Sequence, residues 1–178
     1  FSARLAFLSD ITSRYYFPLE RQRHSAFPGN EWIEKIYFHC QEMLRELTGA
    51  AHVVIKPISG LSAMTVALAA LARGGGTIAT FDPRHGGHAH TALIARRLGV
   101  RTVSLPYQQK HFRVDADLLP GFVRREGVNL IYLDQAQILF PHNVIEMRAA
   151  LPPEVSIYYD GSHVMGLIFG KQFQDPLR

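Results

Sequence analysis

The sequence has one cysteine, Cys40, among its 178 residues. A single cysteine excludes an internal disulfide framework and a cysteine-rich zinc module, and it favours a cytoplasmic protein. Lysine is also scarce, because the chain has only Lys35, Lys56, Lys110 and Lys171. Any chemistry that needs a lysine amine therefore has four candidates in this sequence.

Long hydrophobic runs and basic runs are both missing. The best apolar stretch, 63–72, is interrupted by Thr65 and is shorter than the roughly 20 residues that a membrane span needs. The formal net charge is +4, but pairs such as Arg96 and Arg97 stand among acidic or apolar neighbours. We therefore expect neither membrane insertion nor nucleic-acid binding. The chain starts at Phe1 without an initiator methionine or a signal-peptide pattern, so we expect its beginning to be missing.

The composition is that of a globular protein, with 47% hydrophobic and 19% charged residues, and the length fits one domain or a fragment of one. Short β-branched or aliphatic runs recur about every 25 residues, the length of a strand and a returning helix. The strands expected are 53–55, 77–80, 101–105, 128–132 and 155–159. Helical periodicity or composition predicts helices at 32–47, 62–73, 88–98 and 116–126. Continuous apolar strands are typical of an α/β fold with a largely parallel sheet, so we expect helices on both of its faces.

The first 30 residues differ from the rest. Three aromatic residues, 15–17, are followed by Arg21, Arg23 and His24, with prolines on either side. This composition predicts an extended arm over residues 1–30, which would lie on a partner subunit, and a domain over residues 31–178. An arm left unpaired would expose its aromatic side chains, which favours a homodimer.

Polar features follow several of the expected strands, at the edge where ligands of α/β sheets collect. Ser59 and Gly60 precede a helix of small residues, and free amides at a helix N-terminus suit a phosphate, although such turns are also ordinary caps. The stretch 84–90 carries three histidines around two glycines. It could be a metal site, an aromatic platform or a polar loop, and the absence of a neighbouring carboxylate or cysteine argues against a metal.

Two further strand ends carry acidic or amide side chains. Residues 128–132 lead into Asp134 and Gln135, and residues 155–159 lead into Asp160 with His163 close behind. A buried aspartate needs a cationic or hydrogen-bonding partner, because an isolated buried carboxylate is costly. Taken alone, each could equally be a loop aspartate that caps a helix.

Taken together and in this order, these features resemble the serine hydroxymethyltransferase-like family of fold-type I pyridoxal-phosphate (PLP) enzymes. The matching stretches are Pro57-Ile58-Ser59-Gly60-Leu61, His85-Gly86-Gly87-His88 and Asp160-Gly161-Ser162-His163-Val164-Met165-Gly166-Leu167. The resemblance covers residues 9–178. It implies an aspartate-aminotransferase-like large domain that is incomplete here, with the remainder and a small domain outside this sequence.

The resemblance also implies roles for the matching residues. Ser59, Gly60 and Leu61 would hold the phosphate of PLP, and His88 would stack on its ring. Asp160 would keep the ring nitrogen protonated, and His163 would hydrogen-bond near the cofactor oxygen or the aspartate. Gln135 stands where the family usually has a serine, and its amide could still donate to the cofactor.

Two departures from the family are visible. The lysine that binds the cofactor covalently would lie about two dozen residues beyond the position of Leu167, and none of the four lysines matches it. The family's Tyr-x-Glu-Gly motif is also altered, because its glutamate position falls on Leu19, with Glu20 one residue away as a replacement acid. This second departure argues against tetrahydrofolate as a cosubstrate more than it argues against PLP.

The activity implied is that of an enzyme that makes or breaks the Cα–Cβ bond of a β-hydroxy-α-amino acid, acting as a homodimer on a small amino acid. A folate-independent threonine aldolase or transaldolase is an alternative. A catalytically inactive relative that serves as a structural or regulatory subunit is another, and transamination or racemisation at the same cofactor is a third.

Overall fold

The computed structural model describes residues 2–13, 16 and 29–177. The chain divides into two compact units, Phe1–Ile55 and Lys56–Arg178, and each is described by itself. Half of the predicted arm, residues 1, 14–15 and 17–28, lies outside the described residues, and its contact with a partner subunit stays a prediction. Residues 2–13 are described, and they form a short helix and a 3-10 turn rather than an extended segment.

The first unit contains the short helix α1 (Ser2–Ala6), the 3-10 turn η1 (Asp10–Ser13) and the long helix α2 (Asn30–Thr48). Helix α2 confirms the helix expected at 32–47. It ends at Gly49, which adopts a left-handed conformation with φ 71° and donates its amide to the Arg45 carbonyl oxygen at 2.8 Å.

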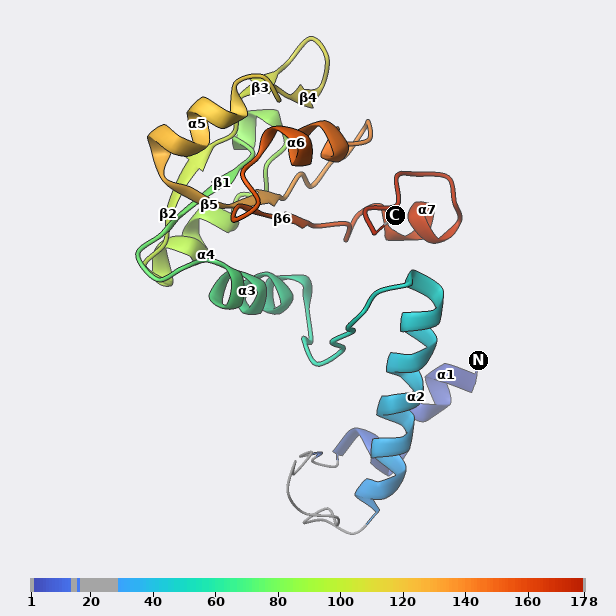
Figure 1. The fold of residues 1–178 in the computed structure, drawn as a ribbon. Helices are drawn as coiled ribbons and strands as arrows, with labels where there is room; N and C mark the ends of the chain where they lie inside the picture. The colour runs from blue at the N-terminus through green and yellow to red at the C-terminus, as the bar shows by residue number, and fades with distance from the viewer. Residues whose placement is uncertain (1, 14–15, 17–28, 178) are drawn as a thin grey trace. The chain divides into compact units, whose positions relative to one another are not determined.

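The second unit is a four-stranded parallel sheet with the strand order β2-β1-β5-β6 (Figure 1). Its strands are β1 (Thr77–Thr80), β2 (Arg101–Ser104), β5 (Val128–Leu133) and β6 (Ser156–Tyr159). Its helices are α3 (Gly60–Leu71), α4 (Thr91–Arg97), α5 (Leu119–Glu126), α6 (Val144–Ala150) and α7 (Met165–Phe169). The 3-10 turn η2 (Pro83–His85) and a two-stranded hairpin, β3 (Tyr107–Gln108) with β4 (Arg113–Val114), complete it.

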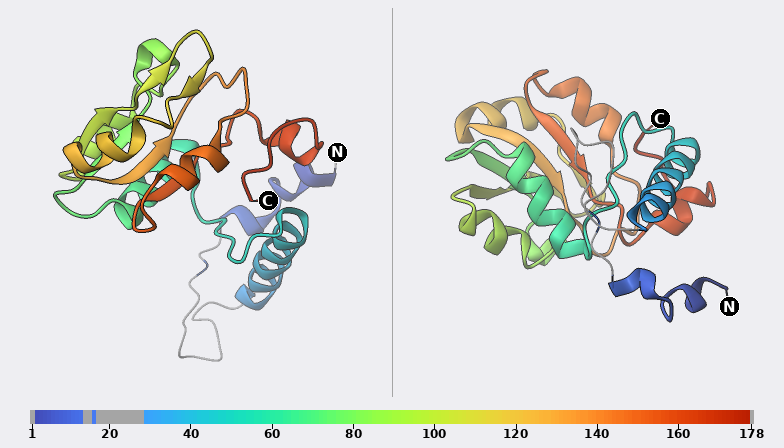
Figure 2. Two further views of the ribbon diagram at one scale, coloured as in Figure 1. Left: turned by 45° about the horizontal axis from the view of Figure 1, so that its top comes forward. Right: turned by 90° about the horizontal axis from the view of Figure 1, so that it is seen from below.

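Helices cover both faces of this sheet, as the two views of Figure 2 show. Side chains of α3 and α4 pack with Ile78, Leu130 and Tyr132 on one face. Side chains of α5 and α6 pack with Ala79, Ile131 and other residues on the opposite face. The central strands β1 and β5 are buried on both faces, which explains their continuous apolar sequences, whereas the edge strands β2 and β6 are partly exposed. The expected α/β class with a mostly parallel sheet is therefore confirmed.

Four of the five expected strands form within one residue of their predicted ends, but the strand at 53–55 was wrong. Val53, Val54 and Ile55 pair with no strand among the described residues. The Val53 carbonyl oxygen accepts a hydrogen bond from the Gln41 side chain at 2.6 Å instead, and 67% of Val54 is exposed. β-Branched residues favour a strand only where a neighbouring strand completes the hydrogen bonds.

The predicted helix starts also shifted. The helix expected at 62–73 begins earlier, at Gly60, because Ser59 caps it. Those expected at 88–98 and 116–126 begin three residues later than predicted, at Thr91 and Leu119.

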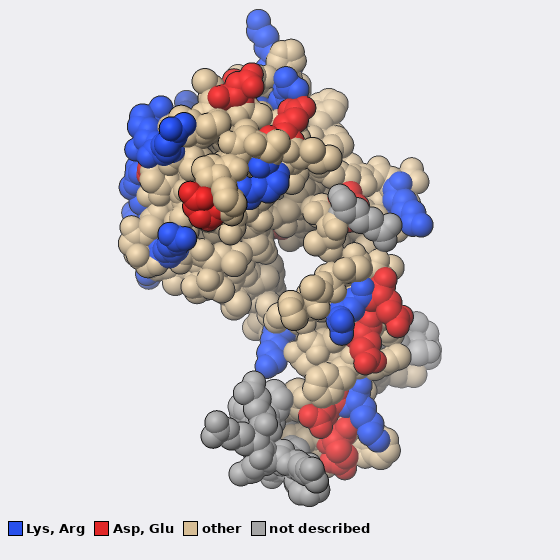
Figure 3. All heavy atoms as spheres, viewed as in Figure 1, with Lys and Arg blue, Asp and Glu red and all other residues tan. Residues whose placement is uncertain are grey.

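Acidic side chains lie among the basic ones on the surface, as the face drawn in Figure 3 illustrates. Four ion pairs are formed among the described residues, joining Asp82 with Arg84, Glu126 with Arg101 and with Arg125, and Glu146 with Arg113. No helix among the described residues is both long enough and apolar enough to cross a membrane.

Candidate active site

The candidate site lies where the order of the strands reverses. The chain passes from β1 outward to β2, then returns to the other side of β1 with β5 and β6. In open α/β sheets, ligands bind outside the carboxyl ends of the strands at such a reversal. A cavity of about 270 Å³ opens here. Its lining residues are Ser59, Gly60, Leu61, Met64, His88, Asp134, Gln135, Ala136, Asp160, Ser162 and His163.

The first residues of α3 form one wall of this cavity. The Ser59 hydroxyl accepts a hydrogen bond from the Ser62 amide at 3.1 Å, and the Ser62 hydroxyl accepts one from the Ser59 amide at 2.9 Å. This reciprocal capping box fixes the first turn. The amides of Gly60 and Leu61 belong to that turn and have no acceptor within the helix, so they present donors and the positive end of the helix dipole.

The histidine loop, residues 85–88, lies beside the end of β5. The His88 amide donates to the Asp134 carbonyl oxygen at 3.1 Å, and the Ala136 amide donates to the Gly86 carbonyl oxygen at 2.9 Å. Gly87 forms an antiparallel bridge with Gln135 between these two bonds. The histidine loop and residues 134–136 thus form a short two-rung ladder, and His88 at its end lines the cavity.

His88 is half-buried, and its Nδ1 accepts a hydrogen bond from the His90 amide at 3.3 Å. A neutral imidazole whose Nδ1 is an acceptor carries its proton on Nε2. The rings of His88 and His90 are 5.4 Å apart and tilted by 47°. The hydrogen bond from the His90 amide therefore holds the Nδ1 edge of the His88 ring, and His88 lines the cavity.

Asp160 lies directly after β6 and lines the same cavity as His88. Its amide donates to the Leu133 carbonyl oxygen at 3.0 Å, and its Oδ1 accepts hydrogen bonds from the amide and the hydroxyl of Ser162. Asp160 is only partly buried, whereas the sequence suggested a buried carboxylate. No Lys or Arg among the described residues forms an ion pair with it, so its charge faces the cavity without a protein cation.

Two stacked tyrosines precede Asp134 and Asp160 on neighbouring strands. Tyr132 and Tyr158 are paired in register on β5 and β6, and their rings are 4.5 Å apart and nearly parallel, at 10°. Burial raises the pKa of both phenols, and the nearby Asp160 carboxylate raises it further. Both hydroxyls therefore stay protonated and uncharged near neutral pH.

Asp134 also lines the cavity, although it belongs to none of the three stretches that match the family. Only 2% of it is exposed, and its Oδ1 accepts a hydrogen bond from the Phe81 amide at 3.1 Å. Burial raises the pKa of this carboxyl, while the hydrogen bond from the Phe81 amide opposes that shift. Its position just after an expected strand was visible in the sequence, as was that of Asp160, but it stands in no family motif.

Seven of the residues predicted for the site line this one cavity: Ser59, Gly60, Leu61, His88, Gln135, Asp160 and His163. The part of each in cofactor binding stays a prediction. Gln135 is buried, and its side-chain nitrogen donates a hydrogen bond to the His85 carbonyl oxygen at 2.7 Å. Glu20 lies outside the described residues. The sequence analysis did not single out Met64 and Ala136, which also line the cavity.

The cavity offers groups that fit PLP. It combines helix N-terminal amides for a phosphate, a carboxylate for a protonated ring nitrogen and an imidazole for a ring face. All four lysines are among the described residues, and none of them lines it. Within the described part of the chain, no group of three or more His, Cys, Asp or Glu side chains is arranged to hold a metal ion.

Comparison with known proteins supports the resemblance to serine hydroxymethyltransferase-like enzymes. No protein-family model matches the chain. The chain is 36% identical to serine hydroxymethyltransferase of Thermoplasma volcanium over 181 residues, which cover 99% of this chain and 42% of that protein. The chain is related to the serine hydroxymethyltransferases. It is also 33% identical to fluorothreonine transaldolase of Streptantibioticus cattleyicolor, over 99% of this chain and 29% of that protein.

A solved structure agrees with these sequence matches. L-Threonine transaldolase from Pseudomonas fluorescens, crystallised in its internal aldimine state, superposes on this serine hydroxymethyltransferase-like chain with a TM-score of 0.85. The identity is 28%, and the match covers 97% of this chain and 40% of that one. The predicted fold type I is confirmed. The chain spans less than half the length of these relatives.

Proposed function

We propose that the protein carrying this chain is a PLP-dependent enzyme that makes or breaks the Cα–Cβ bond of a β-hydroxy-α-amino acid of the serine, glycine and threonine class. The observation that carries the proposal is the convergence of the α3 N-terminus, His88 and Asp160 on one cavity, in a chain related to serine hydroxymethyltransferases and threonine transaldolases.

The cavity residues have distinct roles in this proposal. The amides of Gly60 and Leu61, with the Ser59 hydroxyl, bind the phosphate. Asp160 accepts a hydrogen bond from the protonated ring nitrogen, and its bonds from Ser162 hold the carboxylate in place. His88 covers one face of the ring.

When bound, PLP supplies an electron sink that stabilises a carbanion at the Cα of the amino acid. Asp160 strengthens that sink because its negative charge favours the protonated ring nitrogen. His163, which is exposed at the rim, donates to an oxygen of the cofactor or to Asp160. The lysine that attaches the cofactor is predicted to lie outside the 178 residues.

Cofactor binding is tested by titrating the natural-length protein with PLP and recording visible absorbance, then trapping the adduct with borohydride and mapping it by mass spectrometry. We expect a new absorbance band and one modified lysine. Asp160→Asn should weaken PLP binding at least about tenfold, because it removes the charge opposite a protonated ring nitrogen. The matched control is Asp117→Asn, at an exposed aspartate before α5 that lines no described part of the cavity. Wild-type protein with neither absorbance nor adduct would refute the proposal.

A transaldolase activity is the second candidate, supported by the matches to fluorothreonine transaldolase and L-threonine transaldolase. Incubation with threonine and an acceptor aldehyde would give a new β-hydroxy amino acid. Incubation with serine and tetrahydrofolate would give glycine if the hydroxymethyltransferase reaction holds. Glu20→Gln should slow only the folate-dependent reaction, because Glu20 replaces the acid of the family's Tyr-x-Glu-Gly motif. Protein that binds PLP and turns over neither pair would support an inactive structural or regulatory subunit.

Homodimerisation and a cytoplasmic location are further parts of this proposal. The aromatic residues of the predicted arm and the single cysteine support them. Sedimentation of the natural-length protein would test the first, and fractionation of cells the second.

A further inference from the structure

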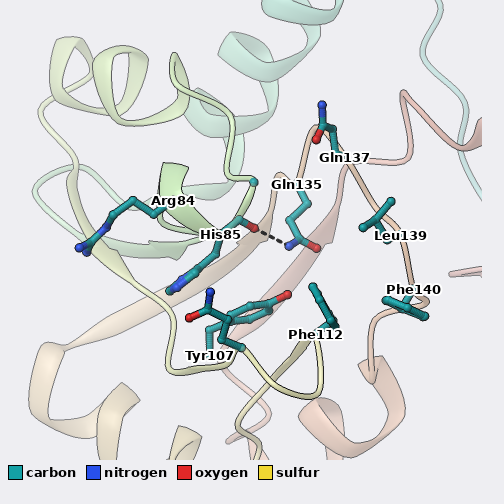
Figure 4. A pocket seen from close by; sticks show the side chains of 10 residues that line it. Arg84, His85, Tyr107, Phe112, Gln135, Gln137, Leu139 and Phe140 are labelled. Carbon is teal, nitrogen blue, oxygen red and sulfur yellow. Dashed lines mark hydrogen bonds between the residues drawn. The ribbon is translucent and has the colours of Figure 1, made fainter.

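Gln135 lies between two cavities. It lines the candidate cofactor cavity and also a second one of about 160 Å³ on the other side of the histidine loop, whose walls include Tyr107, Phe112 and Phe140. Figure 4 shows this second cavity, with the Gln135 side chain reaching across to the backbone of His85. The Gln135 side chain therefore contacts the first residue of the loop that ends at His88.

The glycines of this loop allow it to approach the sheet but give it no side chain to hold it there. Gly86 has φ +84°, which favours glycine, and a Cβ on Gly87 would lie 2.1 Å from the Phe81 carbonyl oxygen. The loop is joined to 134–136 by two backbone hydrogen bonds, which flank the antiparallel pair Gly87 and Gln135. A ladder this short is marginal by itself.

The Gln135 side chain supplies a third connection at the start of the loop. Its Nε2 donates to the His85 carbonyl oxygen at 2.7 Å, and only 8% of the residue is exposed. A buried hydrogen bond whose partner is removed leaves an unsatisfied polar group, so its loss costs more than an exposed one. The His85 ring is fixed separately, stacked on Tyr107 at 4.8 Å and 28°.

We propose that Gln135 is a positioning residue that fastens the loop 85–88 and thereby sets where the His88 ring stands against the cofactor. This inference rests on the proposed function for the cofactor, but the fastening itself does not. Gln135 acts through the His85 carbonyl oxygen and the two-rung ladder, rather than by contact with the reacting atoms.

The fastening is tested by hydrogen exchange of the His88 and Ala136 amides, the two donors of the ladder. Three variants of the natural-length protein are compared. Gln135→Met keeps the length and volume of the side chain without a donor. Gln135→Asn keeps the amide but is one carbon too short to reach. Gln137→Met is the matched control, because it makes the same change at an exposed residue two positions along the same segment.

The hydrogen-exchange rates of the His88 and Ala136 amides should rise about tenfold in Gln135→Met and in Gln135→Asn. They should not change in Gln137→Met. Exchange within β5, measured at Ile131, serves as the control for global unfolding, because this residue is fully buried in the sheet. Unchanged exchange at His88 in both Gln135 variants would overturn the proposal.

The positioning role has its own readout in the bound cofactor. The dissociation constant for PLP should rise roughly three- to tenfold in both Gln135 variants, and the visible circular dichroism of bound PLP should change because its neighbouring ring has moved. If exchange rises while the affinity and dichroism stay as in the wild type, Gln135 fastens the loop but does not position His88, and the proposal is wrong. Wild-type protein that binds no PLP would refute the proposed function, whereas the exchange measurement would still decide the fastening.

Discussion

Replacing Gly87 by alanine would test the close packing on which the histidine loop depends. The new Cβ would meet the Phe81 carbonyl oxygen at 2.1 Å and the Phe81 carbonyl carbon at 2.7 Å, whereas ordinary contact begins at 3.4 Å. Both are backbone atoms at the end of β1, which cannot turn aside as a flexible side chain could. The loop must therefore retreat by about 1 Å, and the hydrogen bonds on either side of Gly87 must lengthen or break.

The size of the effect follows from those bonds. The two rungs of the ladder and the Gln135 side chain give three hydrogen bonds across this contact. At about 1 kcal/mol each, Gly87→Ala should lower the free energy of unfolding by about 3 kcal/mol. Urea denaturation of the natural-length protein measures this value, and a PLP titration of the same samples should show weaker binding because His88 moves with the loop.

Gly121→Ala is the matched control for this substitution. Gly121 lies inside α5, and a Cβ there would have no neighbour within 4 Å. Alanine is a better helix former than glycine, so this variant should be about 0.5–1 kcal/mol more stable than the wild type. If Gly87→Ala unfolds at the urea concentration of the wild type while Gly121→Ala behaves as expected, the packing against Phe81 has been misjudged.

Two further predictions concern the cap of α3 and a buried histidine. Ser59→Ala removes the capping box, so the free energy of unfolding should fall by about 1 kcal/mol in urea titrations and PLP binding should weaken. The control Ser104→Ala, at an exposed strand position, should change neither the stability nor PLP binding. His142 is buried against Phe81, and burial lowers its pKa from 6.5 to about 4. Because the unfolded chain binds this proton at a higher pH than the folded one, stability should fall as the pH drops from about 6.5 to 4, by about 3 kcal/mol from this group. His142→Phe should show a correspondingly flatter dependence of the urea midpoint on pH, and an unchanged slope would contradict the assignment.

The sequence predicted the central strands of the second unit's sheet well because β1 and β5 are buried on both faces. Residues 77–80 and 128–132 read as apolar runs between glycine-rich or polar stretches, and both form strands. Residues 53–55 have the same composition but no strand beside them among the described residues. A strand is a property of a pair of segments, so composition alone could not separate these cases.

The residues of the site could be predicted only where a motif keeps them close in sequence. Ser59, His88 and Asp160 each stand in a recognisable stretch, and each lines the cavity. The bond from Gln135 to His85 joins residues 50 positions apart, and it depends on how two loops meet at the edge of the sheet. No local pattern carries that information, which is why Gln135 was expected to serve the cofactor alone.

Asp134 and Asp160 illustrate how structure separates residues that the sequence presents as equals. Each directly follows a strand of the parallel sheet, and each lies two positions beyond one of the stacked tyrosines Tyr132 and Tyr158. Asp134 is almost fully buried and spends Oδ1 on the Phe81 amide, so its carboxyl joins the ends of β5 and β1. The Asp160 carboxylate accepts its hydrogen bonds from Ser162 in the next turn and remains partly exposed at the cavity. A cationic ligand can approach Asp160 without breaking a bond between strands, whereas drawing Asp134 toward the ligand would release Phe81 and the sheet edge beneath the histidine loop.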